Sequence, residues 1–268
     1  KQPPGSDPQG GGEMSMEDVP TIEDPAAMIR DLELMWQTCP PQQWNGEACE
    51  ALFVKADQVG ATENPYWDIV RNLPVDQFCL YDNHPLQVDP FKCKRGRDYL
   101  VDRHQLTKTF GWSIPTPGDI EWITSVLGGR GVVEIGADTG YWAWQLAQAG
   151  ADVVAVDLLP GDENTYCAAT QYHPVHRGGP EVAGLHPERA LLLCWPPYGA
   201  PMAAESLRAY EGDLLIWIGE GDGGCTGDEE FFRVRDAGWE HIGDSPAHVT
   251  FSGIHCFVEA YRRKGGQP

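Results

Sequence analysis

The residues best suited to chemistry stand at positions 132–140, where the sequence reads VVEIGADTG, and at Asp157. The apolar residues predict a strand, the glycines a tight turn, and the residues from Thr139 a helix. Glycines let a ligand approach the backbone, and a helix N-terminus offers unpaired N–H groups to an anion. Asp157 closes the next predicted strand, where a carboxylate can accept hydrogen bonds from a ribose diol. The pattern predicts a nucleotide-type ligand on this strand–turn–helix unit.

Two common phosphate-binding motifs do not fit these residues. The dinucleotide fingerprint G-x-G-x-x-G needs glycines where Asp138 and Tyr141 stand, and no G-K-[ST] of a P-loop is present. The segment resembles motif I, E/D-x-G-x-G-x-G, of class I S-adenosylmethionine-dependent methyltransferases, and Asp157 resembles the acid of their motif II. Asp138 stands where that family usually has its middle glycine. The resemblance covers residues 119–263, about half of the chain.

The resemblance implies S-adenosylmethionine as the cofactor and S-adenosylhomocysteine as its product. Glu134 would support the loop and the cofactor's ammonium, Asp157 would hold the ribose hydroxyls, and Leu158 would pack on the adenine. Asp138 brings a side chain to a place of close backbone approach, and pairing with the ammonium is one role it could take. The implied cofactor residues are Glu134, Gly136, Ala137, Asp138, Gly140, Asp157, Leu158 and Trp195.

A second motif, LLLCWPPY at residues 191–198, is a predicted buried strand that ends in a Pro-Pro turn between aromatics. It resembles motif IV, [DNS]-P-P-[YFW], of amino-methylating methyltransferases. Trp195 takes the polar position, and indole cannot accept a hydrogen bond, which counts against an adenine or glutamine amide as target. The alternative is a core turn packed by aromatics. The candidate substrate-binding residues are Tyr141, Trp142, Pro196 and Pro197, of which Tyr141 and Trp142 equally suit a core.

A third segment, IGEGDGGCTGD at residues 218–228, follows the predicted fifth strand. Its glycines permit tight turns or close approach to a ligand. Glu220 and Asp222 could take a proton from the acceptor or hold an ammonium or hydroxyl, and the alternative is a solvated acidic loop. With Tyr198 they are the candidate catalytic residues.

Basic residues gather in one stretch of this acidic chain, and they could bind a substrate carboxylate or phosphate or form a solvated face. They are Lys92, Lys94, Arg95, Arg97, Arg103 and Lys108. The motifs G-x-S-x-G and H-E-x-x-H are absent, and no acid set suits a magnesium site, so no metal is expected.

The elements that must position these residues alternate between strand and helix from residue 116 on. Thr116-Pro117-Gly118-Asp119 predicts the capped start of a helix over 117–127. Strands are predicted at 131–135, 151–156, 190–194, 213–218, 241–242 and 255–262, with a weaker one at 173–177, and helices at 139–148, 202–210 and 228–236. Continuous apolar runs suit strands buried on both faces. The expected fold is α/β and Rossmann-like: an open, mostly parallel seven-stranded sheet, its last strand antiparallel, with helices on both faces.

The expected organisation has three parts. Residues 1–20, rich in glycine, proline and acid, are expected to form a disordered tail. Residues 21–115 are expected to be a mainly helical cap that supplies the substrate pocket, with helices from about Asp24 to Trp36 and over 46–58. Residues 116–268 would bind the cofactor.

Composition narrows the partners. The 268 residues include 19 basic and 40 acidic ones, for a net charge of −21, which disfavours nucleic acid. No apolar run is long enough for a membrane span. Eight cysteines without a CxxC pair are expected to be reduced thiols in a cytoplasmic protein.

These features together favour an S-adenosylmethionine-dependent methyltransferase for a small molecule or a peptide, with a tailoring role in secondary metabolism as a further hypothesis. Three alternatives stay open. One is an amino-group methyltransferase for a nucleic-acid base, one is a cofactor-binding partner subunit without catalysis, and one is a nicotinamide oxidoreductase, which the glycine spacing disfavours.

Overall fold

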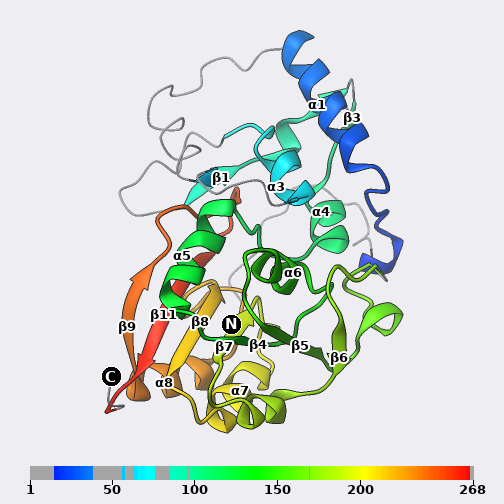
Figure 1. Cartoon of the computed structure of the whole chain (residues 1–268). Helices are drawn as coiled ribbons and strands as arrows, with labels where there is room; N and C mark the ends of the chain where they lie inside the picture. Colours follow the sequence, from blue (N-terminus) through cyan, green and yellow to red (C-terminus); the bar gives the residue numbers. More distant parts are fainter. Residues whose placement is uncertain are drawn as a thin grey trace.

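A seven-stranded sheet forms the centre of the computed structural model, which describes residues 15–38, 56–57, 63–75, 85–95, 97–168 and 170–265 (Figure 1). In sheet order the strands are β6 (Val175–Arg177), β5 (Val153–Asp157), β4 (Val132–Ile135), β7 (Ala190–Cys194), β8 (Leu214–Gly219), β11 (Phe257–Arg263) and β9 (Trp239–Asp244). The pairs from β6 to β8 are parallel, and β11 is antiparallel to both of its neighbours. The predicted sheet, including its antiparallel last strand, is confirmed.

Alternate residues of the strands pack against helices on the two faces of the sheet (Figure 1). Val132, Leu192 and Ile216 contact the helices of one face. Val133, Leu191 and Leu215 contact those of the other. The first face carries α5 (Pro117–Leu127) and α6 (Tyr141–Gln148), and the second carries η5 (Pro180–Leu185), α7 (Met202–Ala209) and α8 (Glu229–Gly238). Burial on both faces explains the continuous apolar runs of these strands.

Helix α5 begins and ends as its sequence predicts. The Thr116 hydroxyl accepts the Asp119 N–H at 3.0 Å, and the Asp119 carboxylate accepts the Thr116 N–H at 3.3 Å. Pro117 occupies the first turn, and Gly128 ends the helix with φ of +58°. This reciprocal cap places Asp119 at the carboxyl edge of the sheet, the edge at which its parallel strands end.

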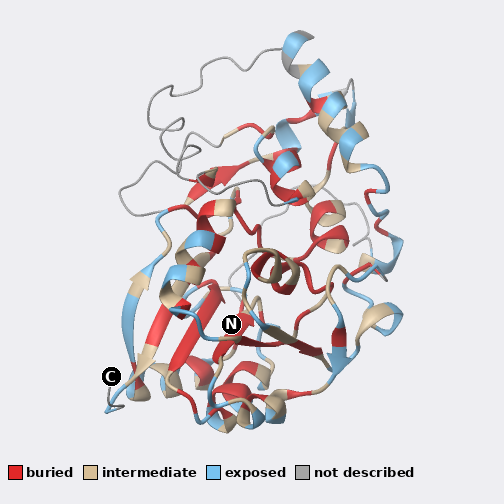
Figure 2. Cartoon of the chain, in the orientation of Figure 1, coloured by how far each residue is buried: buried red, intermediate tan, exposed pale blue. Residues whose placement is uncertain are grey.

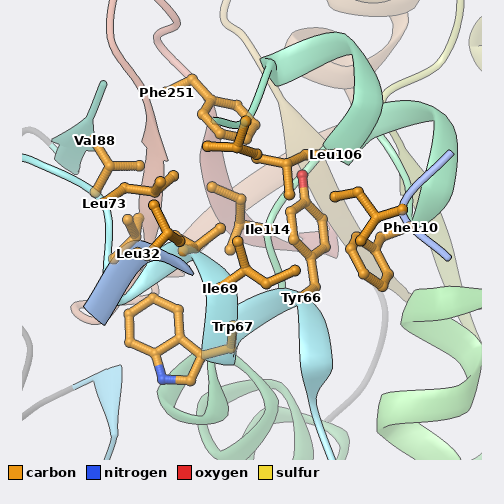
Figure 3. Close-up of a cluster of buried hydrophobic side chains, with 14 of the residues drawn as sticks. Leu32, Tyr66, Trp67, Ile69, Leu73, Val88, Leu106, Phe110, Ile114 and Phe251 are labelled. Atoms are coloured by element: carbon orange, nitrogen blue, oxygen red, sulfur yellow. The ribbon is translucent and has the colours of Figure 1, made fainter. Parts of the chain in front are cut away.

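The N-terminal region has its own apolar core, shown in Figure 3, which includes Leu32, Trp67 and Leu106. Its elements are η1 (Met16–Asp18), α1 (Pro25–Thr38), α3 (Pro65–Val70), β1 (Leu86–Val88), η3 (Pro90–Lys92), β2 (Lys94–Arg95), β3 (Asp98–Tyr99) and α4 (Arg103–Thr109). Strand β1 pairs in parallel with β10 (Val249–Phe251), a segment between β9 and β11. Figure 2 shows buried residues continuing from this region into the sheet. The region is therefore attached to the sheet by both strand pairing and packing.

Several predictions concern residues that the structure describes only in part. The proposed tail, 1–20, is described from residue 15, where η1 forms and Val19 is buried. The helix predicted over 46–58 lies outside the described residues except for 56–57. The weakly predicted strand at 173–177 is β6, and the remaining element, η4 (Gly161–Glu163), follows β5. Within the described parts, no helix combines the length and the apolar character that crossing a membrane requires.

Candidate functional site

Four parallel strands end at one edge of the sheet, and each carries a predicted site residue there. β4 leads into the turn at 136–140, β5 ends at Asp157, β7 is followed by Trp195 and β8 by Glu220. Ligands of open α/β sheets bind outside the carboxyl ends of the strands. The fold therefore gathers the three predicted motifs at the edge where a ligand would bind.

The turn after β4 keeps a glycine-like backbone at Asp138, where the motif that it resembles usually has glycine. Gly136 has φ of +76° and Asp138 has φ of +54°, both in the left-handed region. The Gly136 and Ala137 N–H groups donate to the Val156 carbonyl at 2.9 and 3.0 Å. The Asp138 N–H donates to Oδ2 of Asp157 at 3.1 Å. Asp138 thus takes the backbone conformation of the usual glycine and adds a carboxyl group to the turn.

Gly140 and Leu158 flank this turn. Gly140 begins α6 with φ of +73°, and a Cβ there would lie 3.0 Å from Cγ2 of Val175. Leu158 is 58% exposed, directly after Asp157, whose Oδ1 accepts the Leu159 N–H at 2.9 Å. An exposed apolar side chain beside a strand-end carboxylate is a suitable surface for a flat ring.

Glu134 is a buried acid with one carboxyl oxygen that lacks a hydrogen bond from a described residue. It is 2% exposed on β4, and its Oε2 has no hydrogen-bond partner among the residues that the structure describes. Burial raises the pKa of Glu134 well above its usual range, the charges of Asp138 and Asp157 raise it further, and a hydrogen bond from the Ala143 N–H lowers it. A nearby cation would stabilise the ionised form of this carboxyl group.

Asp138 is a second such acid. Both of its carboxyl oxygens are buried, and neither makes a hydrogen bond of normal geometry within the described parts of the chain. Burial raises the pKa of Asp138 to about 7, the Cys167 thiol and the Thr139 N–H lower it, and the Asp157 charge raises it. Three acids therefore meet at the turn, two of them with unpaired oxygens, and this arrangement favours a ligand with positive charge.

Trp195 follows β7 with an unusual backbone. Its φ is +49°, its N–H donates to the Ile218 carbonyl at 2.7 Å, and its ring stacks on Trp112, with centroids 6.5 Å apart and an angle of 9° between the planes. The Pro196 carbonyl accepts the Gly227 N–H at 3.0 Å. The motif is thus fastened to the glycine-rich loop and presents an aromatic pair.

Pro197 and Tyr198 lie on the surface. Pro197 is exposed and forms an isolated bridge with Thr226. Tyr198 is 74% exposed. Neither side chain is enclosed by the protein in this structure.

Glu220 holds the glycine-rich loop together. Its Oε2 accepts the Cys225 N–H at 2.6 Å, and its Oε1 accepts the His255 N–H at 2.8 Å. Its own N–H donates to the Thr226 hydroxyl at 2.8 Å. Asp222, at the tip of the same loop, is exposed. The geometry of Glu220 is that of a clamp between the loop and the chain entering β11.

Tyr141 and Trp142 connect α6 to the N-terminal region instead of facing solvent. Burial raises the pKa of the Tyr141 hydroxyl, which donates to Oδ1 of Asn64 at 2.9 Å and accepts the Tyr66 N–H at 3.0 Å. Trp142 Nε1 donates to the Ser113 carbonyl at 3.2 Å. Both side chains are at most 3% exposed, which favours the packing role over contact with a substrate.

The basic stretch divides into paired and unpaired cations. Lys92 lies 3.5 Å from Asp89, Lys94 lies over the Tyr99 ring, and Lys108 Nζ donates to the Glu17 carbonyl. Arg103, half-buried at the start of α4, makes no hydrogen bond or ion pair with a described residue. Burial raises the pKa of both Tyr66 and Cys225, and the positive charge of Arg103 opposes part of each rise. Arg103 is thus a cation of the stretch whose charge reaches Cys225 in the glycine-rich loop.

Sequence reasoning did not find the pair Asp119–His248. Nδ1 of His248 lies 2.8 Å from Oδ2 of Asp119, and the two side chains are 2% and 0% exposed. The two residues are 129 positions apart. The capping motif identified Asp119, but no local pattern marks His248 as its partner.

One group of possible metal ligands is present among the described residues, at His241, Asp244 and Glu259. It lies on β9 and β11, and two of the three residues are exposed. Nε2 of His241 already hydrogen-bonds to Oδ1 of Asp244 at 2.8 Å.

The sequence matches no protein-family model and no curated protein sequence. Among solved structures, the magnesium protoporphyrin IX methyltransferase of Synechocystis with bound S-adenosylmethionine is similar, with a TM-score of 0.38 and 16% identity over 54% of this chain and 76% of that one. A TehB-like S-adenosylmethionine-dependent methyltransferase of Corynebacterium glutamicum has a TM-score of 0.37 and 19% identity over 55% of this chain and 88% of that one. A Burkholderia thailandensis 1,6-didemethyltoxoflavin-N1-methyltransferase, with bound 1,6-didemethyltoxoflavin and S-adenosylhomocysteine, has a TM-score of 0.33 and 16% identity over 54% of this chain and 78% of that one.

Proposed function

We propose that this protein is an S-adenosylmethionine-dependent methyltransferase that acts on a small molecule or a peptide. The observation that carries the proposal is the group of buried acids at the glycine turn. Oxygens of Glu134 and Asp138 are buried and make no hydrogen bond of normal geometry with a described residue, and Asp157 lies beside them. S-adenosylmethionine carries an ammonium and a sulfonium, so it would supply the positive charge that these carboxyls lack.

The residues of this edge suit the parts of that cofactor. Glu134 and Asp138 would hold the ammonium, Asp157 would hold the ribose hydroxyls, and Leu158 would pack on the adenine. A carboxylate can accept about four hydrogen bonds, so Asp157 keeps capacity beyond the two N–H groups that it already holds. Gly136, Ala137 and Gly140 would let the amino-acid part approach the backbone.

The cofactor when bound supplies an electrophilic methyl group, and the protein would position the acceptor and exclude water. The stacked pair Trp195–Trp112 would form an apolar wall beside the acceptor. Residues 21–115 would cap the edge, a proposal supported by the pairing of β1 with β10 and by the hydrogen bond of Tyr141 to Asn64. We also propose that the enzyme works in the cytoplasm and modifies a product of secondary metabolism.

A second candidate is a partner subunit that binds the cofactor without catalysis. The observation that favours it is Glu220, since its buried carboxylate already holds two backbone N–H groups, which favours a structural role over proton transfer. Cofactor binding without turnover on any acceptor would support this candidate. Methylation of a nucleic-acid base is disfavoured by the charge of −21 and by Trp195 in the polar position of the motif.

Calorimetric titration with S-adenosylmethionine and S-adenosylhomocysteine tests the proposal. We expect the wild type to bind both, and Asp157→Asn to bind about ten- to a hundredfold more weakly, because hydrogen bonds to a charged group are lost. Glu211→Gln is the matched control, because Glu211 is exposed at the opposite end of β8. Failure of the wild type to bind either compound would contradict the proposal.

A further inference from the structure

A buried charged pair lies beyond the glycine turn, at the β8–β11 end of the same edge. Asp119 begins α5, and His248 precedes β10. Besides Nδ1 of His248, the Asp119 carboxylate accepts hydrogen bonds from the Ser245 hydroxyl at 2.6 Å and from the Thr116 N–H at 3.3 Å. Asp119 therefore holds three donors, and its contact with Nδ1 fixes the orientation of the imidazole.

The other nitrogen of the ring has the Cys256 thiol as its neighbouring side-chain group, and a thiol is a weak acceptor. Nε2 of His248 is buried and makes no hydrogen bond of normal geometry with any residue that the structure describes. Burial lowers the pKa of His248, but Asp119 and Cys256 raise it more strongly, to about 10. The ring is then positively charged at neutral pH, and Nε2–H is a donor. Buried donors in proteins are normally paired, so this one calls for an acceptor.

The ring lies buried near the strand ends at which ligands of open α/β sheets bind. Cys256, which interacts with His248, precedes β11, and the first residue of β11 pairs with Gly219 at the end of β8. The neighbouring His255 N–H donates to Glu220. Burial raises the pKa of the Cys194 thiol at the end of β7, and both Glu134 and Cys256 raise it further. His248 therefore lies beside the ends of β7 and β8, next to the β4 and β5 ends that form the candidate cofactor site.

A second cation approaches from the N-terminal region. Arg103 has no hydrogen bond or ion pair with a described residue. Burial raises the pKa of Tyr66, the positive charge of Arg103 lowers it, and Cys256 raises it further, so both groups lie near this fully buried side chain. Burial also raises the pKa of Cys225 in the glycine-rich loop, and the Arg103 charge lowers it in part. The acceptor end of the edge thus carries cationic groups, whereas the glycine turn carries acids.

We propose that Nε2–H of His248, oriented by Asp119, binds an oxyanion of the acceptor substrate, which is therefore an organic acid or an ionised phenol or enol. The proposal rests on the methyltransferase function proposed above. It also accounts for methyl transfer without a general base, since Glu220 holds the glycine-rich loop through two backbone N–H groups and Tyr198 is exposed. An acceptor that binds as an anion needs no base. Its oxygen–carbon bond forms as the sulfur–carbon bond breaks, the negative and sulfonium charges cancel, and no proton moves.

Side-chain NMR of histidine-labelled protein, with S-adenosylhomocysteine present, tests this proposal. We expect one doubly protonated imidazole signal at pH 7 that moves saturably with millimolar benzoate and not with benzamide, its uncharged analogue. His248→Asn keeps a donor toward Asp119 and removes Nε2, so the signal should vanish and benzoate affinity should fall by about tenfold or more. His241→Asn is the matched control, because His241 is exposed on β9.

The wild-type spectra decide the matter even if His248→Asn does not fold. A neutral His248 ring at pH 7, no movement with benzoate, or equal movement with benzamide would overturn the proposal. Calorimetry with S-adenosylhomocysteine separates the two proposals. Cofactor binding without benzoate binding defeats the anion site alone, and benzoate binding without cofactor binding defeats the methyltransferase function alone.

Discussion

At the scale of single residues, Asp138 shows how a departure from a familiar motif can be read. A residue other than glycine at φ of +54° is uncommon, and aspartate and asparagine tolerate this conformation better than most. The turn therefore keeps its course while gaining a carboxyl group next to Glu134 and Asp157. The departure changes the electrostatics of the turn and not its backbone.

The first prediction at this scale concerns the pH dependence of cofactor binding. The pKa of Asp138 is about 7 in the unliganded protein, so the carboxyl group is mostly ionised above that pH and mostly protonated below it. A cation binds the ionised form, so affinity for S-adenosylmethionine should fall as pH decreases through 7, by up to about tenfold per unit. Calorimetry at several pH values measures this.

The control for that experiment is Asp138→Asn, which tolerates the same backbone conformation but cannot ionise. Its affinity should be lower at pH 8 and should change less between pH 8 and pH 6 than that of the wild type. An identical pH profile for the two proteins would exclude Asp138 as the titrating group.

The second prediction at this scale concerns Glu220. Glutamine offers one acceptor oxygen where glutamate offers two, so Glu220→Gln leaves the N–H of either Cys225 or His255 without an acceptor. Unfolding in urea should show a loss of about 1–3 kcal/mol. Asp222→Asn, on the exposed tip of the same loop, should change stability by less than about 0.5 kcal/mol. A loss equally small for both variants would show that the clamp does not stabilise the fold.

At the scale of elements, the site depends on connections between segments far apart in the sequence. Helix α6 follows the glycine turn and is joined to α3 through Tyr141, while β1 pairs with β10. The glycine-rich loop is joined to the turn after β7 at Gly227. These links fix the N-terminal region and the loop relative to the carboxyl edge.

The prediction at this scale is that Tyr141→Phe weakens the connection between α6 and α3. The change removes the hydroxyl that bonds Asn64 and leaves the Tyr66 N–H buried without an acceptor. We expect a loss of about 1–3 kcal/mol in the free energy of unfolding, measured in urea. Tyr198→Phe is the control, because its hydroxyl lies on a side chain that is 74% exposed. Equal stabilities of the two variants would contradict the role of Tyr141.

At the scale of the whole molecule, the excess of acidic residues is the property that most affects stability and the choice of partner. The net charge of −21 implies mutual repulsion between surface acids in the folded chain. The same excess repels phosphate backbones, and it makes the positive charges of Arg103 and His248 unusual in this chain. Charge thus separates the candidate partners of this protein more clearly than its fold does.

The prediction at this scale is that salt stabilises the fold. Raising ionic strength from 0.01 to 1 M shortens the screening length from about 30 to about 3 Å, which weakens repulsion between the acids. The urea midpoint should therefore rise with sodium chloride, and it should rise similarly with potassium chloride if screening is the cause. A midpoint that falls with both salts would show that attractive surface pairs outweigh the repulsion.

The sequence by itself determined the sheet and the place of the glycine turn. Apolar runs, the Thr116 cap and the glycines act locally, so strand and helix order follow from them, and the predicted seven-stranded sheet is confirmed. The same alternation implied that the residues following β4, β5, β7 and β8 share one edge. Individual bounds differ by a few residues, as for β9, where a two-residue strand was predicted and the strand has six residues.

Only the tertiary structure decided which side chains are free to act. Glu220 and Asp222 are both loop acids by sequence, yet one accepts two backbone N–H groups and the other is exposed. Tyr141 follows the turn as a substrate residue would, but its hydroxyl is held by Asn64. His248 meets Asp119 across 129 positions. Such contacts depend on how distant segments pack, which local patterns do not encode, whereas strand order depends on burial and backbone geometry, which they do.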